Sequence, residues 1–134
     1  MWAQLENAQA ITDARLTSWS HYHALLAPFE AKALLRRPII PEHCQHNAHM
    51  YYVLLNDDAD RDAVLATLKT HEIFSVFHYV PLHNSPAGKR YARTHGTMAV
   101  TNRQSARLIR LPLWVGITPE QQLRVVDVLA HALA

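Results

Sequence analysis

The first 26 residues of this 134-residue chain carry the pattern that most constrains its fold. Mostly apolar residues recur there at steps of three or four, which is the spacing of one helical face, while Tyr22 flanks this face. Pro28 predicts the end of the helix. No capping residue precedes the pattern, so we expect the chain to begin within a long helix that occupies residues 1–27. We name the following set the N-terminal stripe: Trp2, Leu5, Ala8, Thr12, Leu16, Trp19, His23 and Leu26.

Three later segments have the patterns of strands. HMYYVLL, residues 49–55, is apolar on both alternating faces, so we expect a central strand that is buried on both sides. IFSVFHYV, residues 73–80, predicts a second strand. QSARLIRLPLW, residues 104–114, predicts a short helix or turn that leads into a third, and Ile39 with Ile40 suits a short extended piece.

Two more helices have recognisable starts. Capping oxygens from three aspartates precede one helix, and a capping box begins the other. The first helix would use Asp57, Asp58 and Asp60, with Val64, Leu65 and Leu68 on its apolar side. The second would use Thr118, Pro119 and Gln121, with Leu123, Val126 and Leu133 facing the core. Residues 81–102 contain two prolines and two glycines without periodicity, and are predicted to form a long irregular loop with room for one helical turn.

The order of these elements predicts one α/β domain. A small antiparallel or mixed sheet would be covered mostly on one face by helices, with the long N-terminal helix among them. The length suits a single core, since 49% of the residues are hydrophobic.

Composition excludes several classes of protein. The net charge of +2 is small and the basic residues are scattered, so we expect no nucleic-acid partner. The chain has neither a signal peptide nor a stretch long enough to span a bilayer, which predicts a cytoplasmic protein without membrane contact. A single cysteine, Cys44, excludes an internal disulfide and fits a reducing compartment.

The histidines near Cys44 have the residue types of a metal site, but not its spacing. His43 and His46 follow a proline and His49 opens a strand, so their convergence on one ion would need a special loop. A nucleophilic pair of Cys44 with histidine would need an orienting group that the sequence does not identify. We therefore expect His43 and His46 to be solvated loop residues and His49 to lie at a sheet edge, with no metal and no catalytic residue in this segment.

FHYVPLH, residues 77–83, is more informative. It brings His78, Tyr79 and His83 together where a strand ends, and imidazole and phenol groups there can bind phosphate, hydroxyl or carbonyl oxygens. The residues alone leave open the alternative that Tyr79 packs in the core while His78 caps a turn.

Five segments, in the same order, resemble the closing part of the DegT/DnrJ/StrS-type sugar aminotransferases: WAQLENA, NAHMYYVLL, FHYVPLH, SPAG and SARLIRLPLW. The resemblance covers nearly the whole chain. It implies that residues 1–134 form the small C-terminal domain of a homodimeric fold type I enzyme. Residues 1–27 would then connect this domain to a cofactor-binding domain that the chain lacks.

The resemblance also implies a reaction. Such enzymes use pyridoxal phosphate on a lysine to transfer an amino group from glutamate to a dTDP-linked keto sugar, here for surface glycans of the enterobacterial common antigen type. Lys32, Lys69 and Lys89 do not lie in the family's lysine-bearing context. We therefore expect pyridoxal phosphate in the complete enzyme, but no covalently bound cofactor and no complete transamination in this chain alone.

The resemblance places His78 and Tyr79 near the substrate's sugar or diphosphate, with His83 as a further substrate-binding candidate. Asn47 with His49 is a weaker pair. Arg107 and Arg110 are interpreted as structural arginines that lie over core strands.

Two hypotheses remain open. The chain is either a domain that functions only with the cofactor domain, or a stand-alone, non-catalytic module that binds a nucleotide sugar or a protein. The first predicts that Leu5, Leu16, Trp19 and Leu26 of the N-terminal stripe form an exposed apolar patch.

Overall fold

Strand β2 (Tyr51–Leu55) lies at the centre of a three-stranded antiparallel sheet in the computed structural model, which describes residues 2–133. It pairs with β1 (Leu35–Arg36) on one side and with β3 (Leu108–Leu111) on the other. In this register Val53 lies opposite Ile109, and Leu55 opposite Leu35. Residues of like polarity therefore share a face, and the predicted central strand is confirmed.

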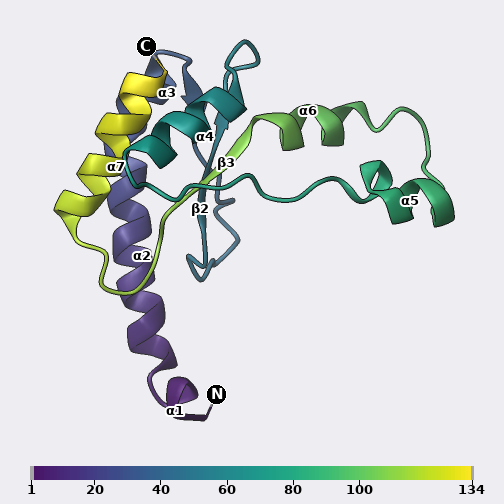
Figure 1. The fold of residues 1–134 in the computed structure, drawn as a ribbon. Coiled ribbons are helices and arrows are strands. Elements are labelled where there is room, and N and C mark those ends of the chain that lie inside the picture. Colours follow the sequence, from purple (N-terminus) through teal and green to yellow (C-terminus); the bar gives the residue numbers. More distant parts are fainter. Residues whose placement is uncertain (1, 134) are drawn as a thin grey trace.

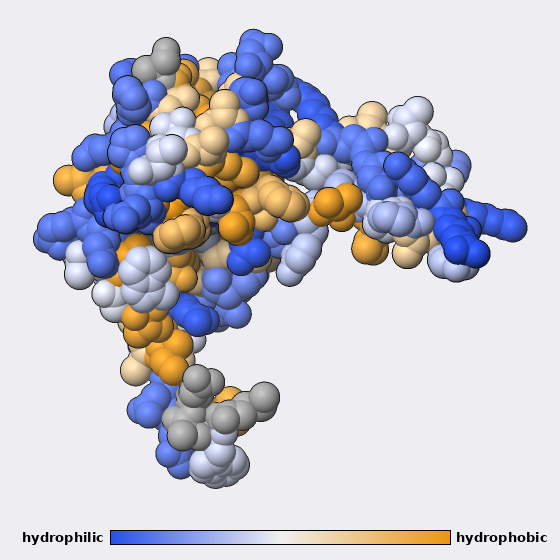
Figure 2. All heavy atoms as spheres, in the orientation of Figure 1, coloured by the Kyte–Doolittle hydropathy of each residue, from blue (hydrophilic) through white to orange (hydrophobic). Residues whose placement is uncertain are grey.

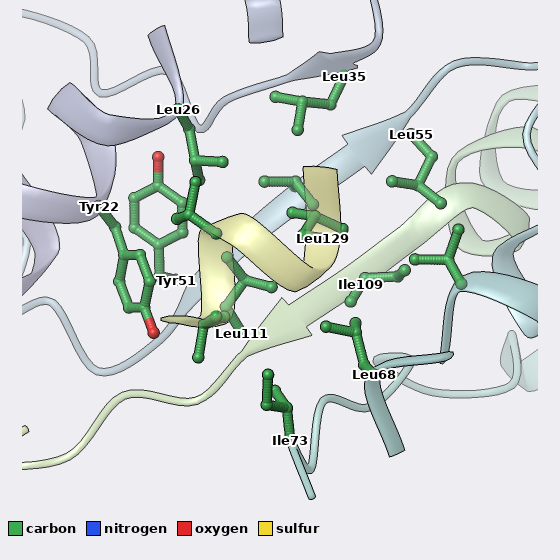
Figure 3. Close-up of a cluster of buried hydrophobic side chains, with 14 of the residues drawn as sticks. Tyr22, Leu26, Leu35, Tyr51, Leu55, Leu68, Ile73, Ile109, Leu111 and Leu129 are labelled. Atoms are coloured by element: carbon green, nitrogen blue, oxygen red, sulfur yellow. The ribbon is translucent and has the colours of Figure 1, made fainter. Parts of the chain in front are cut away.

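Three helices cover the apolar face of this sheet. Helix α7 (Pro119–Ala132) packs against both α2 (Ala8–Leu25) and α4 (Arg61–Thr70). Figure 3 shows Leu129 of α7 among core side chains of the sheet and of the neighbouring helices. The α/β architecture, the antiparallel sheet and the long N-terminal helix are as predicted.

The long N-terminal helix is divided into three segments. A short helix α1 (Trp2–Leu5) precedes α2, and α3 (Ala27–Ala31) follows it. The long helix ends at Leu25, just before Pro28 as predicted, and Pro28 itself stands in the first turn of α3, where a missing backbone N–H breaks no hydrogen bond. Met1 and Ala134 lie outside the described residues.

The second half of the N-terminal stripe is covered by its own domain, which corrects most of the expected apolar patch, whereas Trp2, Leu5 and Ala8 at its start are exposed. Trp19 is 8% exposed and Leu26 is fully buried, while Leu16 is partly buried against the core. Tyr22, predicted to flank the stripe, is fully buried and donates a hydrogen bond to the backbone oxygen of Pro112 at 2.9 Å. Of the expected patch, only Leu5 is exposed.

The predicted strand at residues 73–80 does not form. Only Val76 bridges the sheet, through a pair of backbone hydrogen bonds with Arg110. The backbone N–H of Ser75 is turned toward the oxygen of Ile73, so pairing starts late, and the chain then leaves the sheet at Phe77. Alternating apolar residues suited a strand, but Phe77, Tyr79 and Val80 are exposed rather than paired.

The chain that leaves the sheet forms a projection, here called the arm, residues 77–107. It contains the 3₁₀ turn η1 (Leu82–Asn84) and the helices α5 (Pro86–Tyr91) and α6 (Ala99–Arg107). Figure 1 shows α5 far from the sheet, with α6 leading back to β3. The predicted irregular loop at 81–102 is therefore mostly helical. On the face shown in Figure 2, the tip of the arm is mainly hydrophilic.

The predicted helix starts agree with the structure, and two details differ. Asp60 caps α4 by accepting hydrogen bonds from the backbone N–H groups of Asp62 and Ala63, and Thr118 forms the capping box of α7 with Gln121. Leu123 is 47% exposed, because the core face of α7 is formed by Gln122, Val125, Val126 and Leu129. The short extended piece is β1 rather than Ile39 and Ile40, which are both exposed. Within residues 2–133, no helix is long and apolar enough to cross a bilayer.

Candidate functional site

A cleft of about 350 Å³ opens where the arm joins the domain. Its volume lies at the lower end of the range of small-molecule sites, roughly 300–1,000 Å³. The lining combines aromatic and aliphatic surface with one guanidinium, one phenol and two amides. The lining residues are Arg61, Phe77, Tyr79, Val80, Pro81, Asn84, Asn102, Ser105 and Ala106.

Tyr79 lies at this cleft and not in the core. It is 70% exposed, and the exposed imidazole of His78 contacts its ring edge-on, with 4.7 Å between ring centroids. The alternative of a core Tyr79 is therefore wrong, since both side chains are available to a ligand at the start of the arm.

His83 lies deeper in the arm, partly buried. Its Nε2 lies 2.8 Å from Oδ1 of Asn102, and Asn84 donates a hydrogen bond to the same oxygen at 2.8 Å. Asn84 and Asn102 line the cleft, whereas His83 contacts it through Asn102. The structure thus brings all three predicted residues to one segment, with Tyr79 alone in the cleft lining.

Arg61 joins the arm to the rest of the domain. Its Nη1 donates to the backbone oxygen of Ser105 at 2.9 Å, and its guanidinium lies over the Phe77 ring, 5.3 Å from the centroid. Asp62 accepts two further hydrogen bonds from it, at 3.0 and 2.8 Å. Sequence reasoning missed Arg61, Asn84 and Asn102, because residues as far as 44 positions apart meet only when the arm folds.

The stretch of sequence that contains the arm is rich in basic residues. No aspartate or glutamate occurs between Glu72 and Glu120, while this stretch contains Lys89, Arg90, Arg93, Arg103, Arg107 and Arg110. Two of these, Arg103 and Arg107, are paired with Asp57. Such an excess of positive charge attracts anionic ligands. This excess of basic over acidic residues could have been found in the sequence. The basic residues themselves are scattered, and the signal is the absence of acidic residues between Glu72 and Glu120.

Arg107 occupies a structural position, as interpreted from the sequence, and the same interpretation of the Arg110 side chain stays a prediction. Arg107 donates from Nε to the backbone oxygen of Leu55 and from Nη1 to Asp57, so it fastens α6 to the end of β2. Arg110 lies within β3 and its backbone forms the bridge with Val76.

The histidines around Cys44 serve separate local contacts. His46 meets the Trp19 ring edge-on, with 4.6 Å between centroids, and His49 Nδ1 lies 2.9 Å from Oδ1 of Asn47. Cys44 is exposed. In the part of the chain that the structure describes, no three His, Cys, Asp or Glu side chains converge as metal ligands do. Neither Asn47 nor His49 lines the cleft of the arm.

The lysines do not fit a covalent pyridoxal phosphate site. Lys32, Lys69 and Lys89 are all exposed, and none lines the cleft of the arm or a second cavity of about 420 Å³ beside α7. That cavity lies between the Phe74 segment and α7, and it contains none of the predicted site residues. A Schiff-base lysine needs a desolvated or charge-tuned pocket, which these positions lack.

Comparison with known proteins gives a consistent family. Residues 1–130 match the model of the DegT/DnrJ/EryC1/StrS aminotransferase family. The fold is similar to a DegT DnrJ EryC1 StrS aminotransferase from Brucella abortus, at a TM-score of 0.81 and 23% identity over 97% of this chain and 33% of that one. It is similar to S. venezuelae DesV in complex with a ketimine intermediate, at a TM-score of 0.83 and 22% identity over 98% and 34%. Helicobacter pylori PseC, an aminotransferase of pseudoaminic acid biosynthesis, gives a TM-score of 0.83 and 15% identity over 98% and 35%.

Proposed function

Because the chain belongs to the DegT/DnrJ/EryC1/StrS aminotransferase family, we propose that it is the small C-terminal domain of a pyridoxal-phosphate-dependent sugar aminotransferase. The chain spans about a third of the length of the solved structures that it resembles. Its role would be to bind and enclose the nucleotide-sugar substrate, using the cleft of the arm. We place His78, Tyr79 and His83 among the residues that contact this substrate.

The observation that carries the proposal is the exposed His78–Tyr79 pair beside a cleft that contains Arg61 and two amides. Phenol, imidazole and amide groups exchange hydrogen bonds with sugar hydroxyls in either direction. The faces of Phe77 and Tyr79 offer apolar surface to the sugar ring. The acid-free basic stretch favours a substrate that carries a diphosphate.

The proposed reaction is amino transfer from glutamate to dTDP-4-dehydro-6-deoxyglucose, giving dTDP-4-amino-4,6-dideoxygalactose for surface glycans of the enterobacterial common antigen type. Its support is the order of the motifs HMYYVLL and FHYVPLHNSPAG. Since none of the lysines fits a covalent cofactor site, we assign no covalent step to this chain. A cofactor-binding domain, a homo-oligomeric enzyme and a cytoplasmic location belong to the same proposal.

A second candidate function has an observation of its own in its favour. Trp19 and Leu26 are buried by the domain itself, so the second half of the N-terminal stripe needs no other domain to cover it. A stand-alone module that binds a nucleotide sugar without catalysis would have this property.

Ligand binding by the 134-residue chain tests the shared part of both candidates. We expect titration with dTDP-4-dehydro-6-deoxyglucose, followed by amide NMR, to shift the signals of Tyr79, Asn84 and Ser105. Tyr79→Ala should weaken binding. Phe74→Ala is the matched control, because Phe74 is 74% exposed but lines the other cavity. Shifts confined to the Phe74 cavity, or no shifts, would contradict the proposed site.

Adding a separately produced cofactor-binding domain of the same family distinguishes the two functions. Association with this chain and turnover of the keto sugar would support the transaminase domain. Ligand binding without any association would favour the stand-alone module instead.

A further inference from the structure

Asn102 of α6 lies between the two legs of the arm and contacts three groups. Its Oδ1 is 2.8 Å from Nε2 of His83 and 2.8 Å from Nδ2 of Asn84, while its Nδ2 is 3.3 Å from the backbone oxygen of Thr97. These contacts connect η1 with the start of α6 across 18 and 19 positions of sequence.

The contact with Thr97 fixes the orientation of the Asn102 amide. A backbone oxygen can only accept a hydrogen bond, so the group that faces Thr97 must be the NH₂ of Asn102. Its oxygen therefore faces His83 and Asn84. An amide oxygen can only accept, so Nε2 of His83 must carry the proton when the ring is neutral.

The backbone of Asn102 is held through both its N–H group and its carbonyl oxygen. Its N–H donates to the backbone oxygen of Met98 at 2.9 Å, and its own backbone oxygen accepts a hydrogen bond from Oγ of Ser105 at 3.0 Å. Ser105 is in turn held by Arg61, through its backbone oxygen. A side chain on so fixed a backbone can impose one orientation on the ring that it contacts.

The other ring nitrogen of His83 is then a hydrogen-bond acceptor. Within residues 2–133, Nδ1 of His83 has no hydrogen-bond partner, whereas Nε2 is engaged by Asn102. A neutral imidazole with the proton on Nε2 presents a lone pair on Nδ1. This lone pair suits the hydroxyl proton of a sugar.

We propose that Asn102 is a positioning residue that holds His83 with its proton on Nε2, so that Nδ1 accepts a hydrogen bond from a hydroxyl group of a sugar substrate that extends from the cleft past Asn102. The inference rests on the proposed function for the identity of the ligand. The role of Asn102 toward His83 follows from the geometry alone.

Ring nitrogen NMR of the 134-residue chain tests the first half. At about pH 9, above the usual titration range of histidine, the ¹⁵N shifts of His83 should show a protonated Nε2 and an unprotonated Nδ1. In Asn102→Leu the two shifts should move toward each other, because the ring regains both tautomers. Asn102→Asp keeps an acceptor oxygen and should restore the Nε2 form. A proton on Nδ1 in the wild type, or no response to Asn102→Leu, would overturn the proposal.

Asn84→Ala is the matched control, since it removes the other donor to the same oxygen and leaves the contact with His83 intact. Circular dichroism and the amide spectrum of β2 establish whether each variant remains folded, which we expect since Asn102 is not among the buried residues of the core cluster.

Binding of dTDP-4-dehydro-6-deoxyglucose tests the second half. His83→Ala and Asn102→Leu should each weaken binding by about tenfold, the loss expected for one hydrogen bond to a ligand. If Asn102 acts through His83, the double variant should bind no more weakly than His83→Ala alone. Additive losses would overturn the positioning role.

A negative result in one of the two experiments can be distinguished from a negative result in the other. A wild-type chain that does not bind the sugar nucleotide would remove the proposed function and the hydroxyl contact. The ring nitrogen spectra would still decide whether Asn102 orients His83.

Discussion

Gln122 of α7 donates a hydrogen bond from Nε2 to the backbone oxygen of Ser18 in α2, at 2.7 Å, inside the contact between the two helices. Its Oε1 lies 2.9 Å from Nδ1 of His21, one turn along the same helix. Gln122 is 1% exposed, so a buried polar side chain rather than an aliphatic one joins α2 to the first turn of α7. The pair sets how α7 lies along α2 and thereby how the core closes over the sheet.

Replacing Gln122 with leucine should destabilise the domain by about 1–3 kcal/mol, although leucine is similar in size and more apolar. The variant leaves His21 and a buried carbonyl without their partner. Urea unfolding measures the difference. Leu123→Ala, on the exposed side of the same turn, should change stability by less than about 0.5 kcal/mol. A Gln122→Leu variant as stable as the wild type would show that the hydrogen bonds contribute nothing net.

Asp60→Ala should cost about 1 kcal/mol of stability, because Asp60 accepts hydrogen bonds from two backbone N–H groups at the start of α4. Asp58→Ala is the control: it removes the same charge two residues earlier from an exposed turn position. Thermal unfolding followed by circular dichroism compares the two. Equal losses would indicate that the charge near the helix start matters and that the cap does not.

Local signals in the sequence predicted local structure well. The central strand, the Asp60 cap and the capping box of α7 each depend on residues within a few positions of one another. The buried face of α7 was less accessible to prediction. Gln122 belongs to that face, and a polar residue in the core is recognisable only when its partners on α2 are known.

Features that depend on distant contacts were missed. Alternation at residues 73–80 suited a strand, but the single bridge at Val76 depends on how far β3 extends beside it. The cleft shows the same limit. His78 and Tyr79 were predicted from their motif, whereas Arg61 and Asn102 reach the site only because the arm folds back on α4.

The ion pairs of Asp57 should make stability depend on pH. Hydrogen bonds and charge from Arg103, aided by Arg107, hold the pKa of Asp57 below its ordinary value of 3.8. As the pH falls, the Asp57 carboxyl group is therefore protonated at a higher pH in the unfolded chain than in the folded one. The stabilisation is fully present above pH 3.8 and is lost as pH falls through the lower, folded-state pKa.

Asp57→Asn should thus be less stable than the wild type at pH 7 and should approach it at strongly acidic pH, where the wild-type carboxyl group is also protonated. Urea unfolding at a series of pH values checks this convergence. Because the pair is solvent-exposed, added salt should reduce the difference at pH 7. A difference that stays constant over the whole range would show that Asp57 acts through packing or neutral hydrogen bonds.

Gly88 should be indispensable to the arm but not to the core. It lies in α5, and a Cβ atom on it would collide with the backbone carbonyl of Leu82 in η1. A flexible side chain at that place could rotate away, but a backbone carbonyl can move only if the chain around it moves. Ser85 adds to this close packing by accepting a hydrogen bond from the Gly88 N–H at 2.9 Å. Gly88→Ala should therefore separate α5 from η1. Amide hydrogen exchange in residues 82–92 should rise toward that of an unstructured segment, while exchange in β2 stays unchanged. Ala87→Ser, at the exposed neighbouring position, should leave both regions as they are.

If Gly88→Ala preserved slow exchange in the arm, the contact between α5 and η1 would have to be looser than the structure describes. If it also destabilised β2, the arm would be part of the cooperative core rather than a projection that folds beside it.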